Sequence, residues 1–120
     1  MEIRKKQKMA YDKGLAERIR QVLRGRSDVE EKIMFGGICF MVSGHMCCGI
    51  VQDNLMARVG AEKYEQSLTK DHAREMDFTG RPMKGMIYVA PEGVSSDKDL
   101  ENWISVCVDF TTSLPPKDSD

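Results

Sequence analysis

The chain has 120 residues, of which 41% are hydrophobic and 31% are charged, and its formal net charge is −1. This length allows one domain with one core, because cores rarely divide in chains shorter than about 250 residues. The balanced charge and the sequence pI of about 6.1 exclude a general electrostatic attraction to nucleic acids or anionic membranes. No apolar run reaches the roughly 20 residues of a membrane span, and no secretory signal is visible, so we expect a cytoplasmic protein.

The first residues are basic and almost free of apolar side chains, with lysine or arginine at positions 4, 5, 6 and 8. This composition indicates a flexible basic arm over residues 1–9. We expect the folded domain over residues 10–117 and a tail at 118–120. Within the domain, Asp12 is a suitable helix N-cap, and the apolar residues after it recur at helical spacing until Gly25. This spacing predicts a first helix over about residues 12–24.

Short apolar runs rich in isoleucine, valine, phenylalanine and cysteine fill residues 31–59. Turn signals at residues 43–45 and 53–54 divide this segment, which predicts a three-stranded meander. After the meander, Tyr64 and Leu68 recur at the spacing of one helical face among charged residues. A short second helix is therefore expected there.

Two more strands are expected at residues 76–78 and 85–89, and Pro91 bounds the second because proline cannot donate to a strand ladder. A long last helix is expected to begin at Ser96 or Asp97. Its apolar stripe comprises Leu100, Trp103, Ile104, Cys107, Phe110 and Leu114. The expected order is α-β-β-β-α-β-β-α. It predicts a single-domain α+β fold, an antiparallel sheet with helices packed mainly on one face.

Several segments together carry a family resemblance. They are KIMFGG at residues 32–37, FMV at 40–42, RVG at 58–60, MDFTGRPMKG at 76–85 and YV at 88–89. With this spacing the chain resembles the N-terminal domain of the TfoX (Sxy) competence regulators, from about residue 9 to residue 117. The resemblance implies an α+β fold and an association with bacterial competence and transcriptional regulation. Full-length regulators of this type carry a second, C-terminal domain, so we expect a stand-alone copy of the first domain.

The chain has four cysteines: Cys39, Cys47, Cys48 and Cys107. All lie within apolar segments, which indicates reduced core residues. Cys47 and Cys48 should point to opposite faces of one strand, and separated Cys-x-x-Cys pairs are lacking, so we expect no metal site. We also find no catalytic motif and no cofactor fingerprint. A redox alternative stays open: if Val42 pairs with His45, Cys39 lies opposite Cys48, close enough to form a disulfide under oxidation.

Basic residues supply the candidate binding surface. It comprises Lys13, Arg20 and Arg24 on the first helix, and Arg81 and Lys84 in a loop that Pro82 stiffens. Such a surface can hold the phosphates of a nucleic acid or another anion. Glu17 lies among the helix cations, and every amphipathic helix has a charged face, so a nucleic-acid partner is not favoured.

Nine methionines are present, most of them in or beside the expected strands. Strand alternation places Cys39 and Met41 on the opposite sheet face from Phe40 and Val42. One face of the sheet is therefore expected to be apolar and free of helices, and such a face usually marks an interface. We expect homodimerisation through this face or through the edge of the sheet.

These patterns favour a non-enzymatic interaction or regulatory module that acts through protein–protein contacts. The expected partners are a second copy of the chain and a transcription-related protein, and no membrane. The alternative is a small protein or enzyme that binds an anionic ligand with the loop at residues 80–85, near Gly36 and Gly37.

Overall fold

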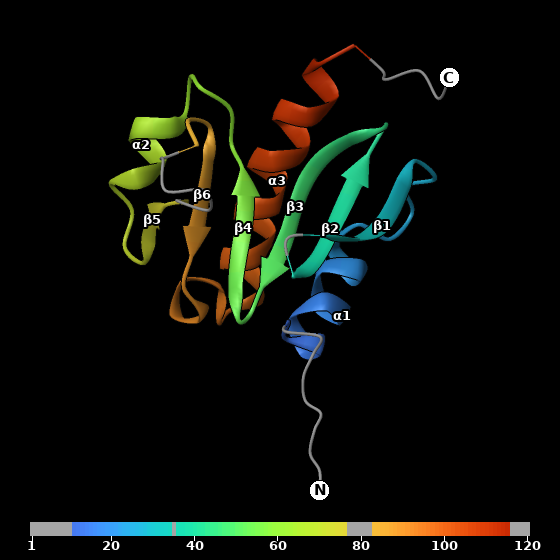
Figure 1. Cartoon of the computed structure of the whole chain (residues 1–120), viewed down its shortest axis with the longest axis horizontal. Helices are drawn as coiled ribbons and strands as arrows, with labels where there is room; N and C mark the ends of the chain where they lie inside the picture. The colour runs from blue at the N-terminus through green and yellow to red at the C-terminus, as the bar shows by residue number, and fades with distance from the viewer. Residues whose placement is uncertain (1–10, 35, 77–82, 116–120) are drawn as a thin grey trace, which may run out of the picture.

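The fold is built on a six-stranded antiparallel sheet with the strand order β1-β2-β3-β4-β6-β5 (Figure 1). The computed structural model describes residues 11–34, 36–76 and 83–115. The strands are β1 (Val29–Met34), β2 (Gly37–Val42), β3 (His45–Val51), β4 (Asn54–Arg58), β5 (Ala73–Glu75) and β6 (Met86–Val89). Neighbouring strands along the chain pair directly from β1 to β4, and β6 lies between β4 and β5.

The helices are α1 (Lys13–Val22), α2 (Tyr64–Leu68), the 3-10 helix η2 (Pro91–Val94) and α3 (Asp97–Ser113). The Asp12 side chain caps α1 by accepting a hydrogen bond from the Leu15 N–H at 3.1 Å, and Ser96 caps α3 in the same way from Asp99. Helix α3 packs along β2, β3 and β4, whereas α2 contacts β5 and β6. None of the helices in the described residues is long and apolar enough to span a membrane.

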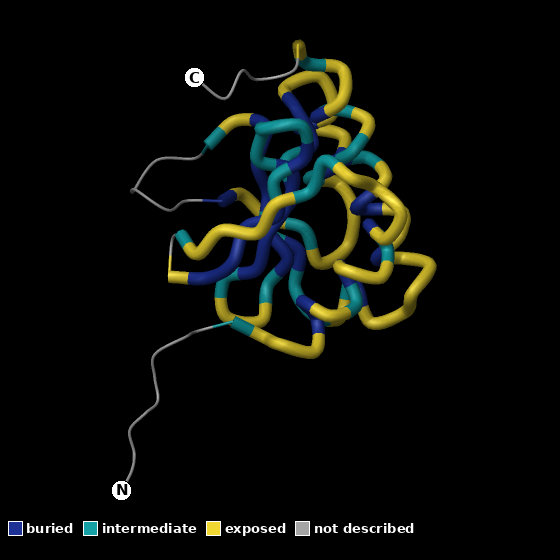
Figure 2. Tube along the Cα trace, turned by 90° about the vertical axis from the view of Figure 1, so that its right-hand side faces the viewer, coloured by how far each residue is buried: buried dark blue, intermediate teal, exposed yellow. Residues whose placement is uncertain are grey.

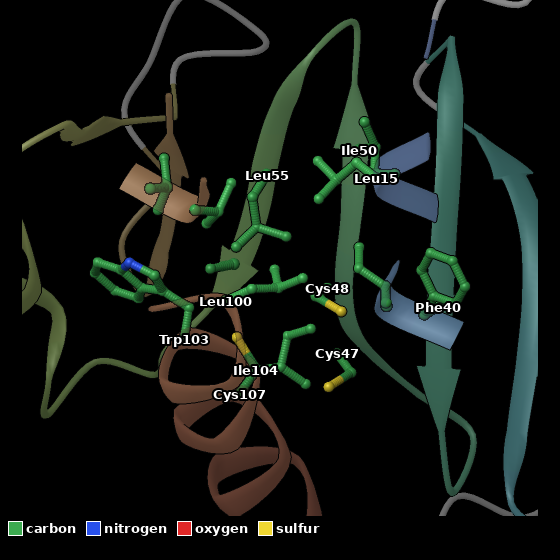
Figure 3. Close-up of a cluster of buried hydrophobic side chains, with 14 of the residues drawn as sticks. Leu15, Phe40, Cys47, Cys48, Ile50, Leu55, Leu100, Trp103, Ile104 and Cys107 are labelled. Carbon is green, nitrogen blue, oxygen red and sulfur yellow. The ribbon is translucent and has the colours of Figure 1, made fainter. Parts of the chain in front are cut away.

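The main core lies between the helices and one face of the sheet. Its largest members include Phe40, Ile50 and Leu55 from the strands and Ile19, Leu100 and Ile104 from the helices. Figure 3 shows the labelled strand side chains, Leu55 among them, and the α3 side chains Leu100 and Ile104 pointing toward one another across the cluster. In Figure 2 the buried stretches lie mainly in the middle of the molecule, and the exposed ones mainly at its outer turns.

The α+β class and the antiparallel sheet with helices on one face are confirmed, and the structure adds one strand to the expected order. The segment expected to begin the meander forms two strands, β1 and β2, because the chain turns before Gly37. Gly36 has a φ of 73°, a conformation that favours glycine. The strand expected at residues 76–78 is found earlier, as β5, and residues 77–78 lie outside the described residues.

Polar contacts tie the start of β1 to the turn between β2 and β3. The Arg26 guanidinium donates to both carboxylate oxygens of Asp28, at 3.0 and 2.9 Å. The Ser43 hydroxyl donates to the same carboxylate at 2.6 Å, and the Ser43 N–H donates to the Asp28 carbonyl at 2.9 Å. The hydrogen bonds from Arg26 and then Ser43 lower the pKa of Asp28 to about 2.

This pKa predicts an acid-dependent part of the stability. Folding lowers the pKa of Asp28, so the stabilisation is complete above the unfolded value of about 3.9 and is lost as the pH falls toward 2. We expect the free energy of unfolding of Asp28→Asn to lie below that of the natural chain at pH 6 and to approach it near pH 2. Urea unfolding measured at several pH values tests this. Asp53→Asn, on an exposed turn, is the control, and an Asp28→Asn deficit that stays constant with pH would contradict the assignment.

Candidate functional site

The face of the sheet opposite the main core carries a second apolar cluster, rich in methionine. Its buried centre consists of Cys39, Met56, Met76 and Met86. Partly buried side chains surround it: Met34, Met41, Met46, Val51, Met83 and Tyr88. We call these ten residues the methionine face. The buried apolar residues of the described helices all belong to the other cluster.

Strand alternation builds this face from the sequence. In β2, Cys39 belongs to the methionine face, whereas Phe40 and Val42 belong to the main core, as predicted. Gly49 of β3 faces Met56 of β4 across the ladder. A Cβ atom on Gly49 would lie 2.6 Å from the Met56 Cε atom and 2.5 Å from the Ile38 carbonyl oxygen. The missing side chain therefore leaves the space that the end of Met56 occupies.

Charged side chains share this face. Glu30 pairs with Met41, and Lys32 pairs with Cys39, in the β1–β2 ladder. Directly opposed residues of an antiparallel pair point to the same side of the sheet. Both charged residues are exposed. The β1 end of the methionine face therefore carries one carboxylate and one ammonium group.

One arginine lies toward the other end of the same face, and a second lies at the end of β4. Arg74 pairs with Tyr88 in the β5–β6 ladder, and its guanidinium lies 4.9 Å from the centre of the Tyr88 ring. Arg58 donates from Nη1 to the Met46 carbonyl at 3.2 Å, and its guanidinium also lies 5.3 Å from the Phe110 ring. Among the described residues, Lys32 and Arg74 therefore place two positive charges on the methionine face, whereas the Arg58 guanidinium lies toward α3. The places of these two arginines depend on the strand register, so they could not be predicted from the sequence.

The basic residues predicted on the first helix are interleaved with acidic groups. Arg20 donates from Nε and Nη2 to the two carboxylate oxygens of Glu31, at 2.7 and 2.9 Å, and from Nη1 to Glu17 at 3.3 Å. The hydrogen bond to Arg20 lowers the pKa of Glu31 below its usual value. Lys13 is exposed on α1, and Arg24 is exposed in the turn after it, because the helix ends at Val22 and not at residue 24 as predicted. The pairing of Arg20 leaves less free positive charge for a nucleic acid than the sequence suggested.

The other two predicted binding residues belong to the segment before β6. Lys84 is exposed, and Arg81 lies outside the described residues. The N–H groups of Val59 and Gly60 donate to the Gly85 carbonyl at 2.8 and 3.1 Å. This places the end of the predicted anion loop beside the chain that follows β4, away from Gly36 and Gly37.

A pocket of about 410 Å³ lies beside that chain, between it and the C-terminal half of α3. It is lined by Val59, Gly60, Ala61, Glu62, Lys63, Val106, Asp109, Phe110 and Ser113. Its charged lining consists of one lysine and two carboxylates. Such a lining does not favour an anionic ligand, because the carboxylates offset the charge of Lys63.

The cysteines do not pair as the redox alternative required. Val42 pairs with His45 as expected, but a bulge between Phe40 and Met41 shifts the register, so Cys48 lies opposite Phe40 and Cys39 opposite Gly49. The prediction that Cys39 faces Cys48 is wrong, because the two thiols lie on opposite faces of the sheet.

The prediction that Cys47 and Cys48 face opposite sides is also wrong. The bulge places both in the main core, near Cys107 (Figure 3). The hydrogen bond with Cys47, together with burial, raises the pKa of Cys48, and the same bond lowers the pKa of Cys47. Burial raises the pKa of Cys107 and raises that of Cys39 to about 11. All four thiols are free and fully buried, which indicates packing. Among the described residues, no group of three metal-ligating side chains could hold a metal ion.

Comparison with known proteins identifies the family. The model of the TfoX N-terminal domain matches residues 21–111, from the end of α1 to the last turns of α3. The chain belongs to the TfoX N-terminal domain family. Neither the curated proteins nor the solved structures compared with it include a match.

The match covers every described strand of this TfoX N-terminal domain. It therefore includes the whole methionine face and the edge strand β1. Most of α1, including Lys13 and Arg20, lies before the matched region. The family thus defines the sheet and α3, and it gives no assignment of a reaction, ligand or partner to particular residues.

Proposed function

We propose that this protein is a non-enzymatic regulatory module that binds a partner protein through its methionine face. In keeping with the TfoX family, the partner belongs to the machinery of transcription or competence. The observation that carries the proposal is the set of half-buried methionines, Met34, Met41, Met46 and Met83, on the side of the sheet away from the packed helices. Flexible thioether side chains suit a binding surface that adapts to its partner.

The chemistry of the surroundings defines the partner segment. Its apolar side would contact the half-buried methionines, since the centre of the face is already buried. Its polar side would be acidic, because among the described residues the cations Lys32 and Arg74 outnumber the carboxylate of Glu30 on this face. Complementary charges of this kind increase the association rate and specificity more than they increase affinity. We therefore expect an amphipathic segment with acidic residues.

Site-specific photocrosslinking in the native cell tests the surface. A benzophenone amino acid at position 41 or 46 is expected to cross-link one acidic, amphipathic segment of another protein, which mass spectrometry identifies. The matched control carries the same group at position 108, where Val108 is half-buried on α3 against the other core. Equal yields of the same partner from position 108 would contradict the proposal.

The identified segment, made as a peptide, allows the charge contribution to be measured. We expect Arg74→Glu to weaken peptide binding about tenfold at low salt, and raised salt to reduce this difference. Isothermal titration gives the affinities, and methyl NMR of the methionine, isoleucine, leucine and valine side chains shows where the peptide lies. Lys70→Glu, an exposed position after α2, is the control for the change in net charge. Peptide signals confined to α1 or α3 would place the surface elsewhere.

A further inference from the structure

We propose that two copies of this chain associate by pairing their β1 strands, antiparallel and edge to edge, with Glu31 of each copy on the two-fold axis. The pairing joins the two sheets into one. This goes beyond the proposed function, which uses a face of the sheet and requires no second copy. The inference rests on the edge position of β1 and on the order of its side chains.

Strand β1 forms one edge of the sheet. It pairs with β2 on one side, and no other described strand pairs with its outer side (Figure 1). It has six residues, whereas β5 at the opposite edge has three. Proteins usually shorten, cover or otherwise block such edges, because unpaired backbone groups bind further strands. Among the described elements, β1 is therefore the edge suited to pairing.

The backbone pattern shows which residues offer free groups. The Ser43 N–H donates to the Asp28 carbonyl at 2.9 Å, directly before the Val29–Val42 pair. Hydrogen-bonded and non-hydrogen-bonded pairs alternate along an antiparallel ladder. It follows that every second residue after Asp28 directs its N–H and C=O toward β2. The residues between them, Val29, Glu31 and Ile33, direct these groups outward.

The side chains select one register. With Glu31 on the axis, Val29 of one copy faces Ile33 of the second copy, and Glu30 faces Lys32. The first pair is apolar and the second is oppositely charged, and the symmetry produces each of them twice. With Lys32 on the axis instead, the two lysines oppose each other and Glu31 faces Ile33. Opposed unlike charges stabilise an antiparallel pair, and opposed like charges destabilise it.

The remaining features of β1 agree with this register. Ile33 is 60% exposed, which is unusual for a large hydrophobic side chain among the described residues. The two Glu31 carboxylates meet at the axis, but each already accepts two hydrogen bonds from the Arg20 guanidinium of its own copy. The pairing therefore brings two Glu31 carboxylates and two Arg20 guanidinium groups together at the axis, so that neither carboxylate is left without a positive partner.

Charge exchange between β1 strands tests the inference. Sedimentation of the natural chain at rising concentration is expected to show a dimer. Glu30→Lys and Lys32→Glu, each alone, turn both ion pairs into repulsions and should raise the dissociation constant about tenfold or more. The double variant Glu30→Lys with Lys32→Glu restores the pairs and should restore the dimer. A mixture of the two single variants should form a heterodimer, because every charge then faces its opposite.

Both positions are exposed, so the variants should remain folded, and thermal unfolding checks this. Hydrogen exchange supplies a direct measure of the register. The amides of Val29, Glu31 and Ile33 should exchange slowly in the dimer and fast in the Lys32→Glu variant. A natural chain that stays monomeric at high concentration would overturn the inference. So would single variants that dimerise like the natural chain, or a mixture that forms no heterodimer.

Discussion

Replacing Phe40 with alanine is expected to lower the free energy of unfolding by about 4 kcal/mol, the largest effect we predict for a single substitution. Phe40 is fully buried in the main core, together with Leu15 of α1 and Ile50 of β3 (Figure 3). Its removal loses the transfer free energy of the ring and leaves a cavity that neighbouring strands and helices cannot fill completely. Chemical denaturation measures the loss, which corresponds to a decrease in Tm of about 15 °C.

Phe110→Ala provides the matched control, because it makes the same substitution at a half-buried position on α3. Phe110 lines the pocket beside α3 and lies under the Arg58 guanidinium, so its removal should cost clearly less. Equal losses for the two variants would mean that Phe40 is not the better packed ring. The comparison is valid only if both proteins keep the same dependence on denaturant.

Gly37→Ala is expected to destabilise the fold by about 3 kcal/mol, although the change adds one methyl group. A Cβ atom at position 37 would overlap the Ile50 carbonyl oxygen and lie 3.0 Å from the Ile50 carbonyl carbon. Both are backbone atoms of β3, so relief requires a shift of that strand and of its ladder with β2. Denaturation in urea measures the loss, and amide exchange across β2 and β3 should show where the ladder opens.

Gly25→Ala separates this steric effect from the general cost of replacing glycine. Gly25 has a φ of 95°, but a Cβ atom there would meet nothing within 4 Å. Its replacement should cost about 1 kcal/mol, from the backbone conformation alone. If Gly37→Ala costs no more than Gly25→Ala, β3 yields easily and the close approach of the two strands is not a constraint.

The sequence was most informative where one strong pattern decided the outcome. The apolar stripe from Leu100 to Cys107 predicted α3, and the N-caps Asp12 and Ser96 fixed the starts of two helices. Strand alternation around Phe40 correctly predicted which residues face the helices. In each case local spacing alone decides the burial, because a helix or a regular strand repeats its geometry.

The errors arose where geometry is not regular. The bulge between Phe40 and Met41 adds a residue to one strand, and no residue type in that stretch predicts a bulge. It placed Cys47 and Cys48 on one side of the sheet and excluded the Cys39–Cys48 pair of the redox alternative. Strands β1 and β2 were predicted as one strand, because the consecutive charged residues of β1 show no alternation of apolar and polar side chains. Its edge position depends on how the whole sheet is assembled.

The register also explains why the candidate surface was only partly predicted. The methionines could be counted, but the positions of Arg74 and Lys32 beside them follow from the register of the β5–β6 and β1–β2 ladders. The reverse holds for Arg20. Its charge was evident from the sequence. Its ion pair with Glu31 depends on β1 lying next to α1, which the sequence did not predict.

Because all four thiols are buried, their reaction with a thiol reagent measures local opening of the fold. A thiol reagent can reach Cys39 on one side of the sheet, or Cys107 on the other, only when the covering structure separates. When the structure closes again faster than the reagent reacts, the modification rate of each cysteine gives the equilibrium between the closed and open forms of its own region. Oxidation of the cysteines should follow the same limit, so that the opened fraction, and not the closed form, sets the rate at which these thiols are damaged.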